Sequence, residues 1–88
     1  MPRVSVVIPT YNRELTTIVA LRSVAAQTWT DREIIVVNDG SSHSMEQLEL
    51  EVANVRGRLL HTENRGVSAA RNLGVSVSDG QWIAFLVS

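Results

Sequence analysis

Three short polar segments, each directly after an apolar run, contain the side chains best suited to bind a ligand. The segments are PTYNRE (9–14), NDGSS (38–42) and TENRG (62–66). An aromatic ring such as Tyr11 stacks on a flat base, and a carboxylate such as Asp39 accepts hydrogen bonds from a base N–H or from ribose hydroxyls. Both residues also suit ordinary loops, because Asp-Gly is a common turn dipeptide. The residues alone therefore leave a ligand site and a set of plain turns both open.

The segment NRGVSAARNLG (64–74) carries more information about ligand binding. Gly66 lets the backbone turn tightly and approach a ligand closely, and the helix that follows presents free backbone N–H groups to an anion. Arg71, up to two turns along that helix, is able to reach back toward the same edge. For an isolated arginine on an amphipathic helix, a solvated side chain is the more common explanation. The segment matches neither G-x-G-x-x-G nor G-x-x-x-x-G-K-[ST], and the chain has no lysine.

Composition excludes several functional classes. The 88 residues contain no cysteine, which excludes disulfides, thiolate metal sites and thiol nucleophiles. Eight basic and nine acidic residues leave a formal charge of −1, so neither nucleic acid nor an anionic membrane is expected as the main partner. His43 and His61 have no companion at metal-ligand spacing and are interpreted as structural. No apolar stretch is long enough to cross a bilayer, and residue 1 does not begin a signal-peptide layout.

Apolar periodicity predicts strands at residues 4–8, 34–37, 58–62 and 82–87, and helices at 13–27, 44–55 and 67–77. Asn12 is predicted to cap the first helix, and Ser44 with Gln47 to form a capping box on the second. The helical residues expected to face the core are Leu15, Ile18, Leu21, Ala25, Met45, Leu48, Val52, Val55, Val67, Ala70, Leu73 and Val77. Trp82, Ile83, Phe85 and Leu86 are expected to add the last strand to the core.

The resulting order βαβαβαβ predicts a three-layer αβα fold around a four-stranded parallel sheet, because right-handed crossovers place helices on both faces. No internal repeat, linker or low-complexity segment interrupts the chain, so residues 1–88 are expected to form a single domain. In such a sheet the loops that follow the strands share one edge, where ligands bind. The three polar segments are therefore expected to meet.

The chain resembles the start of a family 2 inverting glycosyltransferase with the GT-A fold, in four segments that keep their order: VSVVIPTYNR, EIIVVNDGSS, NRGVSAARNLGV and GQWIAFLVS. The resemblance covers nearly the whole chain, and the combination is specific although each motif alone is weak. It implies a Rossmann-like half-domain with strand order 3-2-1-4 that binds a nucleotide-diphosphate sugar for transfer to an acceptor hydroxyl by direct displacement. The residues that it places around the nucleotide are Pro9, Thr10, Tyr11, Asn12, Asp39, Asn64, Gly66 and Arg71.

The last predicted strand departs from the family pattern. Members continue with an FLDSDD-like run whose acidic residues bind Mn²⁺ or Mg²⁺, a Lewis acid that neutralises the departing diphosphate. This chain has FLVS, with Val87 in place of the first acid. The resemblance thus implies a truncated GT-A domain without the metal ligands or the general base. The chain alone is therefore expected to bind the donor weakly and to lack transferase activity.

Two other interpretations use the same elements. A non-catalytic α/β module would self-associate through the last strand, which becomes an exposed apolar edge and predicts a homodimer or higher oligomer. A receiver or flavodoxin-like domain is disfavoured, because the chain has no lysine and PTYNRE is a poor phosphate loop. A cytoplasmic location is expected, with peripheral membrane association of the parent enzyme left open.

Overall fold

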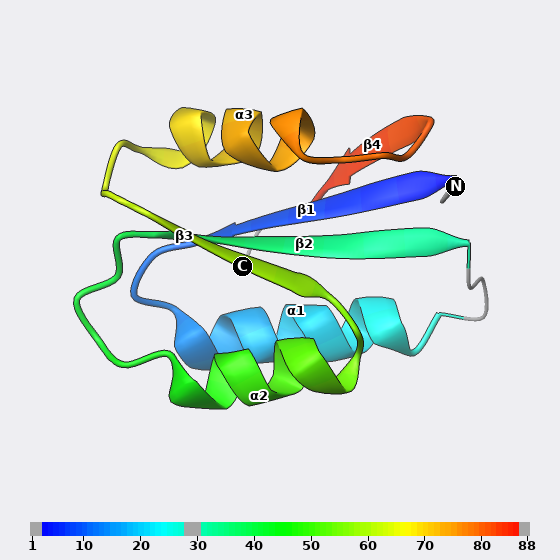
Figure 1. Ribbon diagram of the computed structural model, residues 1–88. Coiled ribbons are helices and arrows are strands. Elements are labelled where there is room, and N and C mark those ends of the chain that lie inside the picture. Colours follow the sequence, from blue (N-terminus) through cyan, green and yellow to red (C-terminus); the bar gives the residue numbers. More distant parts are fainter. Residues whose placement is uncertain (1–2, 28–30, 87–88) are drawn as a thin grey trace.

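The chain forms alternating strands and helices in the predicted order. The computed structural model describes residues 3–27 and 31–86. The elements are β1 (Val4–Thr10), α1 (Glu14–Ala25), β2 (Arg32–Asp39), α2 (Glu46–Asn54), β3 (Arg58–Thr62), α3 (Val67–Ser76) and β4 (Trp82–Phe85). Figure 1 shows them from β1 in blue to β4 in red. Each predicted element is present, and its ends lie within about two residues of the prediction, which is the usual uncertainty of helix and strand boundaries.

The four strands pair in parallel in the order β3-β2-β1-β4, which confirms the order that the resemblance implies. Helix α3 covers one face of the sheet, and α1 and α2 cover the other (Figure 1). The predicted three-layer αβα architecture is thereby confirmed. Because all strands run the same way, the loops that follow β1, β2 and β3 lie at one edge of the sheet.

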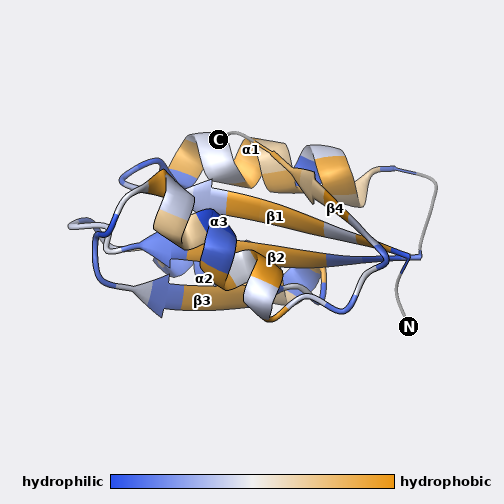
Figure 2. Cartoon of the chain, turned by 90° about the horizontal axis from the view of Figure 1, so that it is seen from above, coloured by the Kyte–Doolittle hydropathy of each residue, from blue (hydrophilic) through white to orange (hydrophobic). Residues whose placement is uncertain are grey.

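Two apolar clusters fill the space between the layers. The cluster between the sheet and helices α1 and α2 contains Val6, Ile8, Ile18, Leu21, Val24, Ile34, Val36, Met45, Leu48 and Val52. The cluster beneath α3 contains Val7, Ile35, Val37 and Ala70. Alternate residues of β1 and β2 point to opposite faces, so a strand covered on both sides is apolar at successive positions. Figure 2 shows both strands as largely hydrophobic between the helices.

Two helical positions differ from the predicted core. Leu15 is 69% exposed and Val67 is 51% exposed, so the prediction is wrong for both. Thr17 is instead fully buried, because its hydroxyl donates a hydrogen bond to Thr10 Oγ1 at 2.7 Å and so keeps a partner after leaving water. Apolarity alone therefore misplaces the edge of the buried stripe on these helices.

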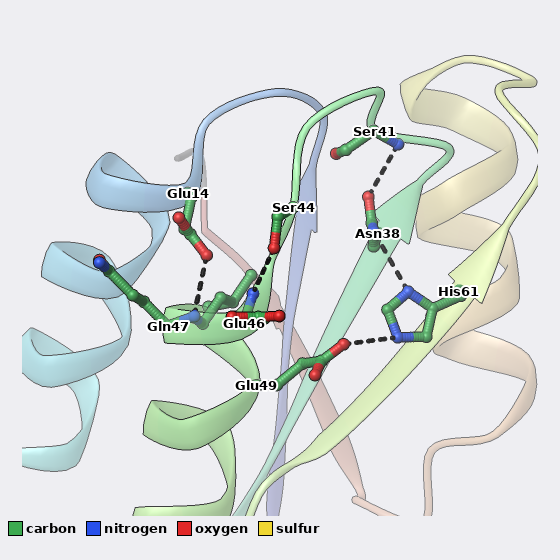
Figure 3. Close-up of polar contacts among 9 residues, drawn as sticks. Glu14, Asn38, Ser41, Ser44, Glu46, Gln47, Glu49 and His61 are labelled. Carbon is green, nitrogen blue, oxygen red and sulfur yellow. Dashed lines mark hydrogen bonds and ion pairs between the residues drawn. The ribbon is translucent and has the colours of Figure 1, made fainter.

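The predicted helix caps are also wrong in detail. Asn12 has φ +52° and precedes the N-cap residue of α1, which is Arg13. At α2 the backbone N–H of Gln47 donates to Glu14 Oε2 at 3.1 Å, where the capping box would use Ser44 (Figure 3). A carboxylate from α1 therefore caps the N-terminus of α2, a pairing that no local sequence pattern reveals.

Strand β4 is far more exposed than its sequence predicts. Trp82 is 65% exposed and Phe85 is 48% exposed, so the prediction that both belong to the core is wrong. Ile83 and Leu86 are partly buried and pack against the two clusters. Within the described residues β4 pairs with β1 alone, and burial of a strand requires neighbours on both sides. The predicted extension to Val87 lies outside the described residues.

Candidate functional site

A cavity of about 410 Å³ opens at the edge of the sheet where the loops after β1, β2 and β3 meet. The residues that line it are Pro9, Thr10, Tyr11, Arg13, Asp39, Asn64, Gly66, Val67 and Arg71. They come from three distant parts of the sequence, which the parallel pairing of the strands brings together. Every residue of the predicted site except Asn12 lines this cavity.

Two lining residues were not part of the predicted site. Arg13 is the N-cap residue of α1, and Val67 is the first residue of α3. Both directly follow predicted site residues within the segments PTYNRE and NRGVSAARNLG, so including the next residue of each segment would have found them. Arg13 adds a second guanidinium group to that of Arg71, and the exposed Val67 side chain adds an apolar wall.

The first loop supplies one fixed and one exposed group. Thr10, at the end of β1, is 3% exposed, and its Oγ1 accepts the hydrogen bond from Thr17 of α1. Tyr11 follows it and is 43% exposed. The helix therefore holds the base of the loop, while the tyrosine ring stands at the rim of the cavity, where a flat ligand is able to stack on it.

Asp39 is a buried carboxylate that binds backbone. Its side chain is 4% exposed, and its Oδ1 and Oδ2 accept the N–H groups of Arg65 at 2.9 Å and Gly66 at 3.0 Å. Gly40 follows with φ +71°, and a Cβ there would lie 2.5 Å from the backbone nitrogen of Asn64. The end of β2 and the loop before α3 are thus held close together. A side chain at position 40 would clash with the loop, and loss of the Asp39 carboxylate would leave two backbone N–H groups without an acceptor.

The N-cap residue of α3 already binds a carboxylate. Gly66, with φ +96°, occupies its N-cap position, and its N–H is already bonded to Asp39. A negative carboxylate at the positive end of a helix is favourable, and it repels a second anion from the same place. The N–H of Gly66 is thus not free for an anion, and anion binding by the N–H groups within the helix stays a prediction.

Arg71 places its charge against an aromatic ring. Its guanidinium carbon lies 5.5 Å from the centre of the Phe85 ring, a cation–π distance. Its Nε is buried and has no hydrogen-bond partner in the described part of the chain. Arg71 also lines the cavity, so its guanidinium supplies positive charge there. Phe85, interpreted from sequence as core, is the residue that supports this arginine.

Asn12 has a different position from the one predicted. It does not line the cavity, and its Oδ1 accepts hydrogen bonds from the backbone N–H and the hydroxyl of Ser42. Its own N–H donates to Ser41 Oγ at 2.9 Å. Asn12 therefore ties the loop after β1 to the loop after β2.

Two kinds of site are absent from residues 3–27 and 31–86. No group of three or more His, Cys, Asp or Glu residues lies close enough together to hold a metal ion. Both oxygens of Asp39, the acid that lines the cavity, are engaged by backbone N–H groups. The divalent ion implied by the resemblance therefore does not fit the residues described, and Val87 lies outside them. Within the same ranges no helix combines the length and apolarity needed to span a bilayer.

Comparisons with known proteins agree with the sequence motifs. The family model described as Glycosyl transferase family 2 matches residues 5–86. An uncharacterized glycosyltransferase of Rickettsia bellii is 44% identical over 98% of this chain, which covers 13% of that protein. The Escherichia coli protein named UDP-Glc:alpha-D-GlcNAc-diphosphoundecaprenol beta-1,3-glucosyltransferase WfgD is 37% identical over 97% of the chain, which covers 34% of it. The chain thus spans about a third or less of these two relatives.

A solved structure shares the fold. The crystal structure of S. aureus TarS 1-349 in complex with UDP superposes with a TM-score of 0.74 at 26% sequence identity. The match covers 98% of this chain and 27% of the TarS chain. The four-stranded parallel sheet and its helices therefore correspond to one part of a larger protein whose structure contains a nucleotide.

Proposed function

The chain belongs to glycosyl transferase family 2, and from this membership we propose that it forms the part of the enzyme that binds the nucleotide-diphosphate sugar donor. The observation that carries the proposal is the cavity at the carboxyl edge of the sheet, which gathers almost the whole predicted site. The UDP in the TarS structure and the UDP-Glc in the name of WfgD support a nucleotide sugar as the ligand.

We propose that the nucleotide contacts two regions of the cavity. We place the base at Tyr11 and Asp39, because an aromatic ring stacks on it and each carboxylate oxygen keeps a lone pair for a base N–H or a ribose hydroxyl. We place the diphosphate near Arg13 and Arg71, since positive guanidinium groups match its charge. We do not place a phosphate at the N-cap of α3, because the Asp39 carboxylate already accepts the Gly66 N–H there.

The reaction of the whole enzyme is proposed to be inverting transfer of a hexose. The acceptor hydroxyl oxygen attacks the anomeric carbon as the bond to the donor phosphate breaks, and a general base takes the hydroxyl proton. The described residues offer no group of three or more side chains that could hold a metal ion. We therefore place the Mn²⁺ or Mg²⁺ ligands and the base outside them, and expect the 88-residue chain to bind the donor without transferring the sugar.

The second candidate function is a non-catalytic module that self-associates. It is supported by β4, which pairs with β1 alone in the described ranges and exposes Trp82 and Phe85. Such a strand is able to pair with a second copy, so we propose a homodimer or higher oligomer of the isolated chain. Light scattering tests this directly, and a clean monomer at high concentration would contradict it.

The location of the parent enzyme is proposed to be cytoplasmic. The support is compositional, because a chain without cysteine suits a reducing compartment. Peripheral association with a membrane is compatible with this location, and fractionation of cells that express the whole parent protein tests both.

Calorimetric titration of the folded chain with UDP-, GDP- and dTDP-sugars, with and without Mn²⁺, tests the donor proposal. We expect saturable binding to one of them, with no enhancement by Mn²⁺, because the described residues include no group of three or more metal-binding side chains. Tyr11→Ala removes an exposed ring and should weaken binding by about tenfold, the usual contribution of one base–aromatic stack. Asp39→Ala should abolish binding.

The matched control is Asp79→Ala, which removes an exposed acid at the turn before β4, away from the cavity lining. This variant should bind as the unmodified chain does. If none of the nucleotide sugars binds a folded sample, the donor proposal is wrong and the self-associating module remains.

A further inference from the structure

A row of hydrogen bonds leads from β3 toward the candidate site (Figure 3). Asn38 Nδ2 lies 3.1 Å from His61 Nδ1, and Asn38 Oδ1 accepts the backbone N–H of Ser41 at 3.0 Å. The Ser41 hydroxyl oxygen in turn accepts the backbone N–H of Asn12 at 2.9 Å. The ring of His61, interpreted from sequence only as structural, thus stands at the outer end of a series that reaches both loops of the site.

The chemistry of these partners determines where His61 carries its proton. The Ser41 backbone N–H is able only to donate, so the oxygen of the Asn38 amide has to face it. The amide NH₂ then faces His61 Nδ1, which has to carry a lone pair. A neutral imidazole with a lone pair at Nδ1 holds its proton on Nε2. Counting donors and acceptors therefore assigns the neutral Nε2–H tautomer.

The surroundings of His61 match this tautomer. Its Nε2 lies 3.8 Å from Glu49 Oε1 on α2, so the N–H end of the ring faces a carboxylate (Figure 3). From the other side, β2 presents the uncharged amide of Asn38. The His61 side chain is 54% exposed, whereas Asn38 is 7% exposed. The buried amide therefore depends on His61 and Ser41 for its hydrogen bonds, since water has little access to it.

We propose that neutral His61 is a positioning residue for the candidate nucleotide site. By fixing the Asn38 amide, it orders the loop at residues 38–42. This loop contains Asp39, whose carboxylate holds the segment before α3, and it anchors Asn12, which directly follows Tyr11. The proposal rests on the proposed function only in taking the cavity as a nucleotide site.

A second proton on His61 breaks the hydrogen bonds that connect it with Asn38 and Ser41. The imidazolium carries N–H at both nitrogens, so Nδ1 then meets the Asn38 NH₂ as one donor against another. Rotating the amide by half a turn repairs that contact but points the NH₂ at the Ser41 N–H. Glu49, the charged group that faces the ring, attracts the imidazolium and does not replace the lost hydrogen bond. Nucleotide affinity should therefore fall where histidine becomes charged.

The first experiment uses the folded chain without nucleotide. Long-range ¹H–¹⁵N NMR of its two histidines distinguishes the tautomers, and we expect the proton of neutral His61 on Nε2. The amide resonances of Ser41 and Asn12 should shift with the His61 titration and stop doing so in His61→Asn, which does not titrate. A neutral His61 with its proton on Nδ1, or Ser41 and Asn12 amides that ignore the titration, would overturn the proposal.

The second experiment measures UDP binding at about pH 8 and about pH 5.5, on the two sides of the ordinary histidine titration. From about pH 8 to about pH 5.5, the dissociation constant of the unmodified chain should increase by a factor about five times larger than that of His61→Asn. The reason is that one hydrogen bond is lost when His61 is protonated. His61→Asn keeps an acceptor near the Nδ1 position, whereas His61→Leu should bind weakly at both pH values.

His43→Asn is the control for a histidine outside the series, and it should keep the pH dependence of the unmodified chain. Equal pH dependence in the unmodified chain and His61→Asn would contradict the proposal. Absence of UDP binding at about pH 8 would instead contradict the proposed function for a uridine nucleotide, and the NMR titration would then decide the role of His61 by itself.

Discussion

Strands β2 and β4 both pair with β1 and both have apolar sequences, but only β2 is buried. Residues 34–39 of β2 are buried without interruption, whereas Trp82 and Phe85 of β4 are exposed. β2 has a strand on each side and helices above and below it, and β4 has one neighbouring strand within the described residues. The apolar sequence of a strand therefore shows only that its side chains are suited to burial. Whether they are buried depends on the strands and helices that pack against it.

The same contrast extends to the cavity. β2 delivers Asp39 as a rigid group, held by the backbone of Arg65 and Gly66. β4 delivers Phe85 as a half-exposed ring that supports Arg71. One side of the site is therefore preorganised by buried hydrogen bonds, and the other by a single cation–π contact. Variants along the two strands should differ accordingly.

The largest effect is expected in the middle of β2. Ile35→Ala removes a fully buried side chain from the cluster beneath α3 and should lower the free energy of unfolding by about 3 kcal/mol. Urea unfolding measures this. Because so large a loss is able to unfold a small domain, Ile35→Val is the milder companion, with an expected loss of about 1 kcal/mol. If both variants were as stable as the original chain, the assignment of β2 to the core would be wrong.

The second-largest loss of stability is expected for a substitution at the end of β2. Asp39→Asn replaces one acceptor oxygen by an NH₂ group that points at a backbone N–H, and should cost about 2 kcal/mol. The same substitution should weaken UDP binding. Urea unfolding and calorimetry together test this expectation. Unchanged stability would show that the carboxylate does not lock the loop before α3.

A smaller effect is expected in β4. Trp82→Ala should lower the free energy of unfolding by less than about 1 kcal/mol, because most of the ring is already in water. The same variant should reduce self-association of the isolated chain, measured by light scattering. A loss as large as that of Ile35→Ala would remove the distinction between the two strands.

The smallest effect is expected for an ion pair on the helical face. A hydrogen bond from Arg22, with its charge, lowers the pKa of Glu51 below the usual glutamate value of 4.5. A carboxyl whose pKa is lowered on folding stabilises the protein at neutral pH, and this stabilisation is lost as the pH falls through the lowered pKa. Arg22→Gln should therefore make the decline of the melting temperature between pH 7 and pH 3 slightly shallower. An unchanged decline would show that the pair is fully screened by solvent.

Much of the fold follows from local signals. The apolar runs predict all the strands, and the helical periodicity of residues such as Leu48 and Val52 predicts α2. The strict alternation of strands and helices along the chain predicts a parallel sheet. The site is also largely predictable, because loops after parallel strands meet at one edge. Arg13 and Val67 lie inside the quoted motifs but were not assigned to the site, because neither residue type by itself indicated a contact with the ligand.

The remaining features could not be read from sequence because they depend on contacts between distant residues. Thr17 is buried because Thr10 accepts its hydroxyl hydrogen, and α2 is capped by Glu14, 33 residues before Gln47. Asn12 accepts a hydrogen bond from Ser42 and does not cap α1. Each of these polar groups has several satisfactory partners in principle, and only the packed fold selects one.

The sequence by itself determined the order of the elements, the parallel sheet and the edge at which polar groups gather, because periodicity and turn residues are local properties. Only contacts in the folded protein show that Trp82 and Phe85 stay exposed, that Asp39 binds the backbone before α3, and that His61 reaches the site loops through Asn38. Burial and hydrogen-bond partners depend on which segments become neighbours in space, and residues far apart in the chain settle that together.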